Sequence, residues 1–574
     1  MHTDRFQQLR KESLSNIFGK SKIISIWRKI VRNQLRQFDF KDLYDHYDFN
    51  YNIEDRATAI RNEILNGTYQ VSLPLIYKLE KKFGVCRHII IPQPIDALVL
   101  QVLVESISNQ IIKHQPSKKS FYSRDKHNVG KPHDAAEYGL SISEQWKKLQ
   151  KEIYKFNTEK KLLIVTDLSN YYDSININEL KKVFLGYVDN NEVLVDILFH
   201  IIEEISWRPD YLPYSGRGLP TSNLEAIRLL AHSFLFEIDE VLKKRTKDSF
   251  TRWMDDIVIG IDSRDEAIEI ISSISDMLKS RGLSINLSKT AIYNSQEANF
   301  HFQIDENKYL DSWKSLKKSC TCYNKITSEI MQSLKKHFHD KSPKYWDKVA
   351  KRYITTFTNL ESDKLLPITP KVYIEHPSLR PNLLHYLLKL GYKGQTANII
   401  IEILENINIF DDISLFKICL LITSWEIPEN KESTEFLEEI NNKLIIESFK
   451  RKKPADFYSV LWFKAKYNSS KELLEFIKKY QNLWQANSFL RRQVTAVMSR
   501  LLITDKEEIL SLLYTQISSG IANTASLANQ VQKFSKIDKI DGKLRFYLFP
   551  KNKQRPYPLP KFIVLCSVLN SEKN

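Results

Sequence analysis

Short apolar runs of strand length alternate with helically spaced segments through the first half of the chain. Three runs predict strands: "VCRHIIIP" (85–92), "KLLIVTD" (161–167) and "SFTRWMDDIVIGI" (249–261). The last is consistent with two short strands that meet at a pair of carboxylates. Apolar residues recur at helical spacing in "DALVLQVLVESI" (96–107) and in residues 265–282. This mixture predicts an α+β fold for residues 1–310.

The pattern changes after about residue 310, where strand-like runs become rare and Leu-rich helical segments dominate. Helices are expected near 381–390, 396–408, 413–423 and 433–449. Two capping boxes mark further helix starts, from Ser469 to Glu472 and from Thr504 to Glu507. The close recurrence favours stacked helix pairs, as in an all-α helical-repeat (HEAT-like) domain over residues 311–574. A plain helical bundle remains an alternative, because no tight sequence repeat is visible.

Both ends of the chain are basic. Arg28, Arg32 and Arg36 share one face of a predicted N-terminal helix. That stripe either faces phosphates or is an ordinary solvated face, and the charge pattern alone leaves both interpretations open. The last segment, "RFYLFPKNKQRPYPLPKFIVL", is basic, aromatic and Pro-rich, and we expect it to dock on the body as a tail.

The overall charge points to a polyanionic partner. Lys and Arg number 85 against 69 Asp and Glu, a formal net charge of +16. Nucleic acid is the first candidate partner and an anionic membrane the second. The alternative is charge that serves only solubility.

Cysteine use and hydropathy favour a cytoplasmic protein with no membrane partner. The five cysteines are few and scattered, so we expect neither a disulfide framework nor a zinc site. The N-terminal residues are polar, and we expect no apolar run to approach the length of a membrane span.

The paired aspartates Asp255 and Asp256 raise a chemical question, because adjacent like charges in an apolar run are costly to bury. A third carboxylate, Asp167, ends a predicted strand and could complete a site for two divalent cations. Oxygen-only ligands suit Mg²⁺, and the charge of the metal would offset the cost of burial. Two such ions roughly 3.5–4 Å apart can activate a hydroxyl and stabilise leaving pyrophosphate. A pair of adjacent aspartates is by itself a weak signal.

The order of the surrounding segments is more specific. Four segments resemble palm motifs A, B, C and D of reverse transcriptases: "VTDLSNYYDSI" (165–175), "GLPTSNLEAIRLLAHSFLFEID" (218–239), "RWMDDIVIG" (252–260) and "GLSINLSKT" (282–290). Residues 79–101 are similar to the preceding fingers motifs, and "NFHFQID" (299–305) is similar to the primer-grip hairpin. The resemblance covers roughly residues 20–310. It implies a right-hand polymerase with fingers and palm in residues 1–310, followed by the helical domain.

The resemblance also implies roles for individual residues. Asp167, Asp255 and Asp256 match the catalytic aspartates, and the metal positions would be these three and Leu168. The dNTP-binding positions would be Arg87, Lys78, Leu168, Tyr172, Pro220, Thr221 and Lys289. Within this set, Tyr172 matches the steric gate that rejects a ribose 2′-hydroxyl, although an ordinary core aromatic is the alternative. Lys289 matches the motif D lysine, for which a plain surface lysine is nearly as good an interpretation. The implied cofactor is Mg²⁺, as two ions, with Mn²⁺ as an alternative.

Two departures from the family pattern bear on template use. Trp253 stands where reverse transcriptases usually carry Tyr or Phe, and a larger ring would crowd the primer terminus. The motif B loop reads Pro-Thr-Ser, where many templated enzymes have Pro-Gln-Gly. Template reading is therefore expected to be altered.

The segments "GLPTS", "RLLA", "EID" and "SFYSRD" (120–125) resemble bacterial reverse transcriptases of abortive-infection and antiphage-defence systems. That resemblance implies a DNA polymerase in phage defence, RNA-directed or template-independent, which in some members is primed by a protein hydroxyl. It also implies dNTPs, a DNA product, a non-coding RNA in some members, and a homo-oligomer. The alternatives are a retron-like or intron-like templated enzyme and a catalytically silent nucleic-acid-binding scaffold.

Overall fold

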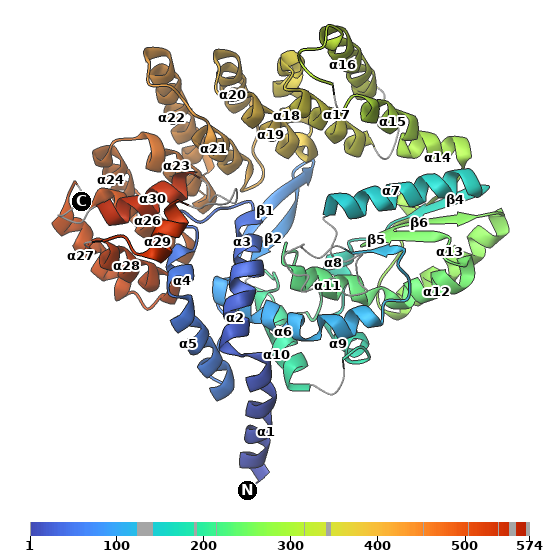
Figure 1. Ribbon diagram of the computed structural model, residues 1–574, viewed down its shortest axis with the longest axis horizontal. Coiled ribbons are helices and arrows are strands. Elements are labelled where there is room, and N and C mark those ends of the chain that lie inside the picture. The colour runs from blue at the N-terminus through green and yellow to red at the C-terminus, as the bar shows by residue number, and fades with distance from the viewer. Residues whose placement is uncertain are drawn as a thin grey trace. The chain divides into compact units, whose positions relative to one another are not determined.

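The computed structural model describes residues 2–122, 142–188, 192–209, 211–213, 215–314, 316–339, 346–451, 453–502, 504–537, 539–549 and 558–569. The chain forms two compact units (Figure 1). The first unit comprises Met1–Phe38, Ile53–Ile76 and His88–Asp305. The second comprises Asp39–Asn52, Tyr77–Arg87 and Glu306–Asn574.

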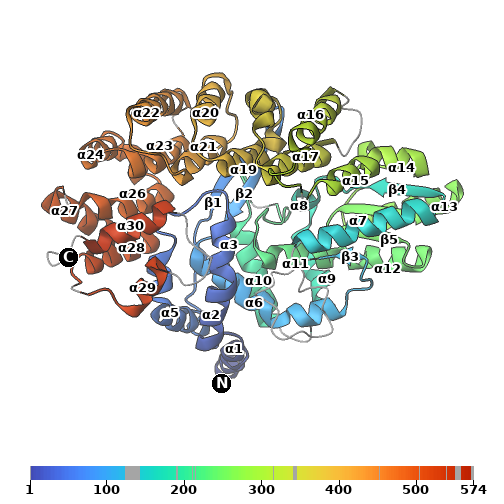
Figure 2. The ribbon, with the colours of Figure 1, turned by 45° about the horizontal axis from the view of Figure 1, so that its top comes forward.

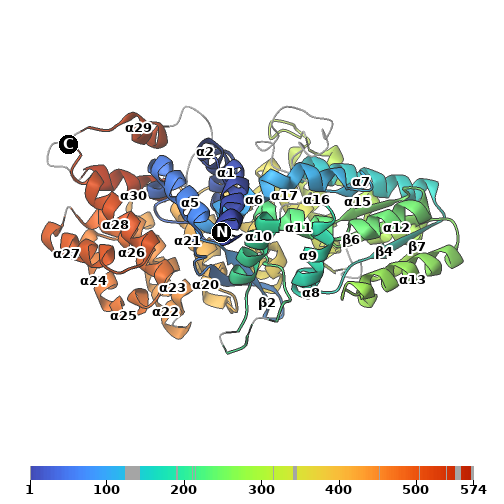
Figure 3. The ribbon, with the colours of Figure 1, turned by 90° about the horizontal axis from the view of Figure 1, so that it is seen from below.

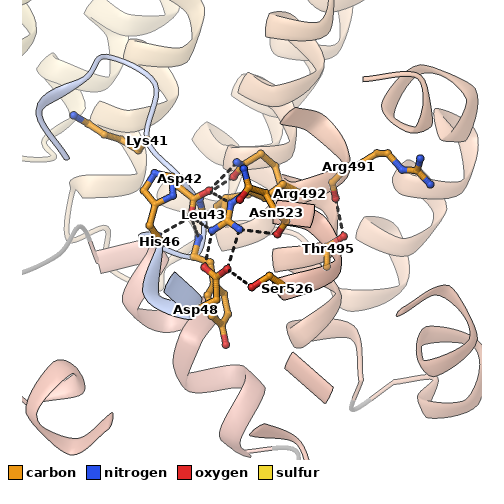
Figure 4. A network of polar contacts seen from close by, with 12 residues as sticks. Lys41, Asp42, Leu43, His46, Asp48, Arg491, Arg492, Thr495, Asn523 and Ser526 are labelled. Atoms are coloured by element: carbon orange, nitrogen blue, oxygen red, sulfur yellow. Dashed lines mark hydrogen bonds and ion pairs between the residues drawn. The ribbon is translucent and has the colours of Figure 1, made fainter. Parts of the chain in front are cut away.

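The main boundary, after Asp305, lies close to the expected division at residue 310, but two early segments fold with the second unit. Buried ion pairs within that unit explain both. Arg492 donates to the carboxylates of Asp42 and Asp48, with shortest contacts of 2.7 and 2.8 Å (Figure 4). The segment around Glu80 is held by Arg380, whose guanidinium lies 2.9 Å from the Glu80 carboxylate.

A five-stranded sheet forms the centre of the first unit. Its strands are β3 (Ser120–Phe121), β4 (Leu162–Thr166), β5 (Phe250–Trp253), β6 (Asp256–Ile261) and β7 (Ala291–Asn294), in the order β3-β5-β6-β4-β7. The β4–β6, β4–β7 and β5–β6 pairs are antiparallel, whereas β3 runs parallel to β5. The predicted strand at 161–167 and the predicted strand pair at 249–261 are both confirmed.

Helices cover both faces of this sheet. α7 (Ile142–Glu159) packs on one face, and α12 (Phe236–Thr246) and α13 (Arg264–Ser280) pack on the other (Figure 3). The remaining helices of the first unit are α1 (His2–Ile17), α2 (Lys20–Ile26), the π-helix η1 (Trp27–Val31), α3 (Arg32–Gln37), α5 (Ile53–Asn66), α6 (Pro94–Lys113), α8 (Tyr171–Ser174), α9 (Ile177–Leu185), α10 (Glu192–Ile205), α11 (Glu225–Phe234), the 3₁₀ turn η4 (Leu287–Lys289) and α14 (Ser295–Phe302). Three elements cross the unit boundaries: the paired strands β1 (Leu75–Lys82) and β2 (Val85–Ile91), and α15 (Ile304–Ser312).

One helix corrects the expectation that no apolar run reaches the length of a membrane span. α6 has 20 residues, and its most apolar stretch has a mean hydropathy of 1.4. However, 67% of that stretch is buried, and α6 packs against α2, α10 and α11. Its buried Asp96 accepts a hydrogen bond from the Tyr69 hydroxyl at 2.6 Å. These contacts are those of a core helix.

The second unit is helical apart from its part of the β1–β2 pair, in the portion of the chain that the structure describes. Its elements are α4 (Tyr47–Tyr51), α16 (Tyr323–His339), α17 (Trp346–Leu360), η5 (Asp363–Ile368), α18 (Thr369–Glu375), η6 (Pro377–Leu379), α19 (Arg380–Leu390), α20 (Gly394–Asn406), α21 (Ser414–Ser424), α22 (Lys431–Arg451), α23 (Pro454–Tyr467), α24 (Ser470–Lys479), α25 (Gln481–Gln485), α26 (Ser488–Leu501), α27 (Lys506–Ile517), α28 (Ala522–Phe534), α29 (Gly542–Leu548) and α30 (Pro558–Leu569). The four helices expected between residues 381 and 449 are confirmed.

Consecutive helices of this unit alternate between two layers. α17, α19, α21 and α23 pack in one row, and α18, α20 and α22 pack in the other (Figure 2). Near the C-terminus, α30 buries Leu559, Ile563 and Val564 and packs on α26. Residues 550–557 of the basic, Pro-rich tail lie outside the described residues.

Two local expectations were wrong. The segment expected as a primer-grip hairpin lies in α14 and α15, because Asn294 and Glu297 form a capping box that starts a helix there. The cap expected at Thr504 falls one residue later, where the Asp505 carboxylate accepts from the Glu508 amide. Cys320 and Cys322 form a single disulfide, with their Cα atoms 5.3 Å apart, and the other three cysteines are free thiols.

Candidate active site

The three aspartates come together at one end of the central sheet. Thr166 at the end of β4 pairs with Ile257 of β6, so Asp167 follows β4 where Asp256 begins β6. Asp255 lies in the tight turn between β5 and β6, after Met254, whose φ of 54° lies in the left-handed region. The sheet register therefore carries two sequence-distant carboxylate segments to one edge.

Burial and charge repulsion both act on the pKa of Asp255 at this edge. Burial raises the pKa of Asp255 to about 7, and the neighbouring charges of Asp256 and Asp167 add to the effect. Asp167 is only 6% exposed. A positive charge would therefore be stabilised here.

Lys289 supplies one such charge. Its ammonium nitrogen lies 2.6 Å from the Asp167 Oδ2 atom. Partial burial lowers the pKa of Lys289, but the hydrogen bond and charge of Asp167 outweigh this and raise it. The structure thus brings Lys289 to the aspartates, and its role as a motif D lysine stays a prediction.

Backbone hydrogen bonds join the loops around the aspartates. The Asn286 amide donates to the Asp167 carbonyl at 2.8 Å, and the Ser169 amide donates to the Ser284 carbonyl at 2.9 Å. The Leu219 amide donates to the Tyr172 carbonyl at 2.8 Å. The segments that resemble motifs A, B and D are therefore fixed to one another by main-chain contacts.

Comparison with known proteins identifies this region. Residues 80–310 match the family model described as reverse transcriptase (RNA-dependent DNA polymerase). The chain contains a reverse transcriptase domain. No curated protein matches the chain.

Solved structures of telomerases show distant similarity. Apo telomerase from Candida tropicalis is 12% identical, with 71% of this chain and 69% of that chain covered and a TM-score of 0.33. A form of it truncated from the C-terminal domain is 14% identical, with a TM-score of 0.28, and covers 39% of this chain and 50% of that one. Telomerase from Candida albicans in complex with the TWJ fragment of telomeric RNA is 12% identical, covers 64% of each chain and has a TM-score of 0.30. Similarity at this level adds nothing to the family match.

Several of the other predicted positions lie in the reverse transcriptase domain beside the aspartates. Leu168 is buried and forms a β-bridge with Ile285. Tyr172 is half-buried in α8, and its ring lies 5.7 Å from that of Tyr171. Pro220 is buried, and the Thr221 carbonyl accepts from the Ile90 amide at 2.9 Å.

The two fingers positions belong to the other unit. Arg87 and Lys78 are exposed there, and the Lys78 amide donates to the Asp412 carboxylate at 2.8 Å. The geometry of the aspartate edge does not include either residue, so their triphosphate-binding role stays a prediction.

The carboxylates fit the divalent metal that polymerases of this type use. They are oxygen donors, they are partly buried, and they already attract the Lys289 ammonium. Within the described residues, no three His, Cys, Asp or Glu side chains form a preformed metal-binding group. The ligands Asp167, Asp255 and Asp256, with Leu168 beside them, therefore remain a chemical fit and not an observed metal geometry.

Sequence reasoning missed the ion pair that supports the turn between β5 and β6. Arg252 in β5 and Asp239 in α12 form a buried ion pair with both side chains 0% exposed, and the two Arg252–Asp239 contacts are 2.7 and 2.5 Å. Arg252 also donates to the Met254 carbonyl at 3.0 Å and to the His232 carbonyl at 3.3 Å. The signal was present as a charged residue within an apolar strand, but nothing in the sequence identified its partner.

Trp253 has a partner that its sequence position did not suggest. Its ring lies 5.4 Å from Trp146 of α7, edge to face at 90°. The Trp253 indole therefore packs against another side chain of its own domain. Crowding of a primer terminus by this ring stays a prediction.

Proposed function

We propose that this protein is a metal-dependent DNA polymerase of the reverse transcriptase type, which adds dNTPs to a hydroxyl group. The observation that carries the proposal is the meeting of Asp167, Asp255 and Asp256 at one sheet edge, inside the matched reverse transcriptase segment. A bound pair of Mg²⁺ ions would supply activation of the attacking hydroxyl and stabilisation of the leaving pyrophosphate.

The chain's own residues have distinct parts in this proposal. Asp167 and Asp255 hold the metal ions, and Asp256 supports the metal or the primer end. Lys289 lies within reach of the same carboxylates and can offer a proton or a positive charge to the pyrophosphate. Tyr172 underlies the sugar and disfavours a ribose, while Pro220 and Thr221 lie against the incoming base.

Incubation of the purified protein with Mg²⁺ and labelled dNTPs tests the proposal. The wild type is expected to incorporate label, and the Asp255→Ala, Asp256→Ala variant is expected to lose incorporation while it keeps its fold. Asp262→Asn is the matched control, because Asp262 follows the opposite end of β6 and pairs with Lys160. Nucleic-acid binding without any incorporation by the wild type would favour the scaffold alternative.

We further propose that the polymerase acts in antiphage defence, as a homo-oligomer whose helical region is of the HEAT-like repeat kind. Support comes from the segments within residues 120–125 and 218–239 that resemble reverse transcriptases of defence systems. It also comes from the helical region that follows the polymerase. Cells that carry the wild-type gene should reduce phage plaquing, and the Asp255→Ala, Asp256→Ala variant should not. Sequencing of the nucleic acid that co-purifies separates copying of a defined RNA from untemplated, protein-primed synthesis.

A further inference from the structure

An exposed aromatic loop directly precedes the segment that holds Pro220 and Thr221 in the polymerase unit. It runs from the end of α10 to Gly218 and contains Trp207, Tyr211 and Leu212 within six residues. These three side chains are 43%, 84% and 51% exposed. Large apolar side chains this close together on a surface commonly mark a binding site.

One of these rings is already held in a stacking arrangement. Trp207 stacks on His88 of β2, with ring centroids 3.9 Å apart and the planes inclined by 11°. Despite this contact, much of the indole surface stays open to solvent. A ring fixed on one side loses little side-chain freedom when a ligand stacks on what remains exposed.

The backbone connects this stack to the predicted base-binding loop. The Ile90 amide, two residues along β2 from His88, donates to the Thr221 carbonyl at 2.9 Å. At the loop's start, the Ser206 hydroxyl donates to the Ile202 carbonyl at 2.7 Å and lies 3.2 Å from the Gly218 carbonyl. The strand that carries His88 and the start of the aromatic loop therefore both contact the segment from Gly218 to Thr221.

The charge of the loop suits a phosphate backbone next to stacked bases. Arg208 and Arg217 are both exposed. The loop's other charged residue, Asp210, lies outside the described residues. Aromatic rings interleaved with cations are the recurring surface for unpaired nucleic acid.

We infer that Trp207, backed by His88, is a stacking platform for an unpaired base of a single-stranded nucleic acid at the polymerase site. The inference rests on the proposed function only where it says that the single-stranded nucleic acid is the one that enters the polymerase site. Tyr211, 84% exposed in the same loop, offers a second aromatic ring, which favours a strand over a single incoming nucleotide.

Fluorescence anisotropy of the full-length protein with labelled dT12 and rU12 tests this directly, without Mg²⁺ or dNTPs. Trp207→Ala should weaken binding at least about fivefold, since stacking on one ring contributes roughly this factor or more. Trp207→Phe should restore most of the affinity. The salt dependence should be unchanged, because no phosphate contact is removed. Tyr514→Ala, which removes an aromatic side chain 57% exposed on α27, is the matched control.

Three results would overturn the inference: no oligonucleotide binding by the wild type, equal binding by Trp207→Ala, or an equal loss in Tyr514→Ala. If Trp207→Ala binds the oligonucleotides equally well but has a higher KM for dNTPs, the second of these results holds and the ring serves the incoming base instead. The oligonucleotide assay contains neither Mg²⁺ nor dNTPs and measures no incorporation. The binding result therefore stands or falls separately from polymerase activity.

Discussion

At the residue scale, the proposed selection of the sugar by Tyr172 can be tested. The Tyr172 carbonyl accepts from Leu219 of the motif B loop, which fixes the position of its backbone. If Tyr172 is the gate, Tyr172→Ala should lower the preference for dNTPs over NTPs by about tenfold or more. This corresponds to a change of about 1.4 kcal/mol in the difference between the activation barriers for the two substrates. The ratio of kcat/KM values for the two substrates measures it.

Tyr171→Phe is the matched control for Tyr172. The Tyr171 hydroxyl donates to the Ala231 carbonyl inside the core, at 2.5 Å. Its loss should reduce stability by about 1 kcal/mol and leave sugar selection unchanged. Unaltered discrimination in Tyr172→Ala would make that ring an ordinary part of the fold.

Lys289 contributes a positive charge where the aspartates repel one another. Lys289→Met should slow dNTP incorporation about tenfold or more, because a positioned acid or cation at the pyrophosphate contributes at least this much. Lys279→Met, an exposed lysine at the end of α13, should have no effect. Single-turnover rates at saturating dNTP make the comparison, and equal rates for both variants would contradict a role for Lys289.

At the element scale, the buried Arg252–Asp239 pair supports the turn between β5 and β6. Arg252→Met should destabilise the polymerase unit by about 3–5 kcal/mol, because it leaves Asp239 buried without its partner. Lys181→Ala, which breaks a surface pair with Asp196, should cost less than about 1 kcal/mol. Urea unfolding of the variants provides both values.

A double variant separates stability from positioning. Arg252→Met with Asp239→Leu removes both charges and should regain much of the lost stability. It still lacks the hydrogen bond to the Met254 carbonyl, so we expect incorporation to stay at least about tenfold below the wild type. Full activity in the double variant would show that the pair only stabilises the fold.

The local elements were predictable because their signals are local. An apolar run before Asp167 predicted β4, two runs that meet at the paired aspartates predicted β5 and β6, and the Ser469–Glu472 box marked the start of α24. The Arg252–Asp239 pair was not predictable, since it joins a strand to a preceding helix through side chains alone. The primer-grip expectation failed for the opposite reason, because a strong local cap at Asn294 overrode the resemblance.

At the scale of the whole molecule, contacts between sequence-distant residues decide which segments fold together. Asp42 and Arg492 are 450 positions apart, and no periodicity or composition links them. Their ion pair ties Asp39–Asn52 to the helical unit, as Arg380 does for the segment around Glu80. Sequence alone therefore gave a boundary near residue 310 and missed both early segments of the second unit.

The Arg492 cluster gives the helical unit a pH dependence whose sign can be worked out. Burial raises the pKa of Asp42, but the charge and hydrogen bonds of Arg492 outweigh it and hold the pKa well below its ordinary value. A carboxylate with a depressed folded pKa stabilises the protein fully above its unfolded value of about 3.9. That stabilisation is lost as the pH falls below this value.

Asp42→Asn should therefore destabilise the helical unit by about 3 kcal/mol at pH 6, where Arg492 loses one of its two buried carboxylates. The difference in unfolding free energy between the variant and the wild type should shrink by about 1.4 kcal/mol per pH unit below about pH 3.9. Below this pH the Asp42 carboxyl takes up a proton when the wild type unfolds, which favours unfolding. Urea-dependent hydrogen exchange of peptides that span residues 39–52 measures it. Asp347→Asn, a half-exposed carboxylate paired with Lys351, should cost less than about 1 kcal/mol throughout. A difference that stays constant from pH 6 to pH 3 would mean that the charge of Asp42 does not hold this segment in place.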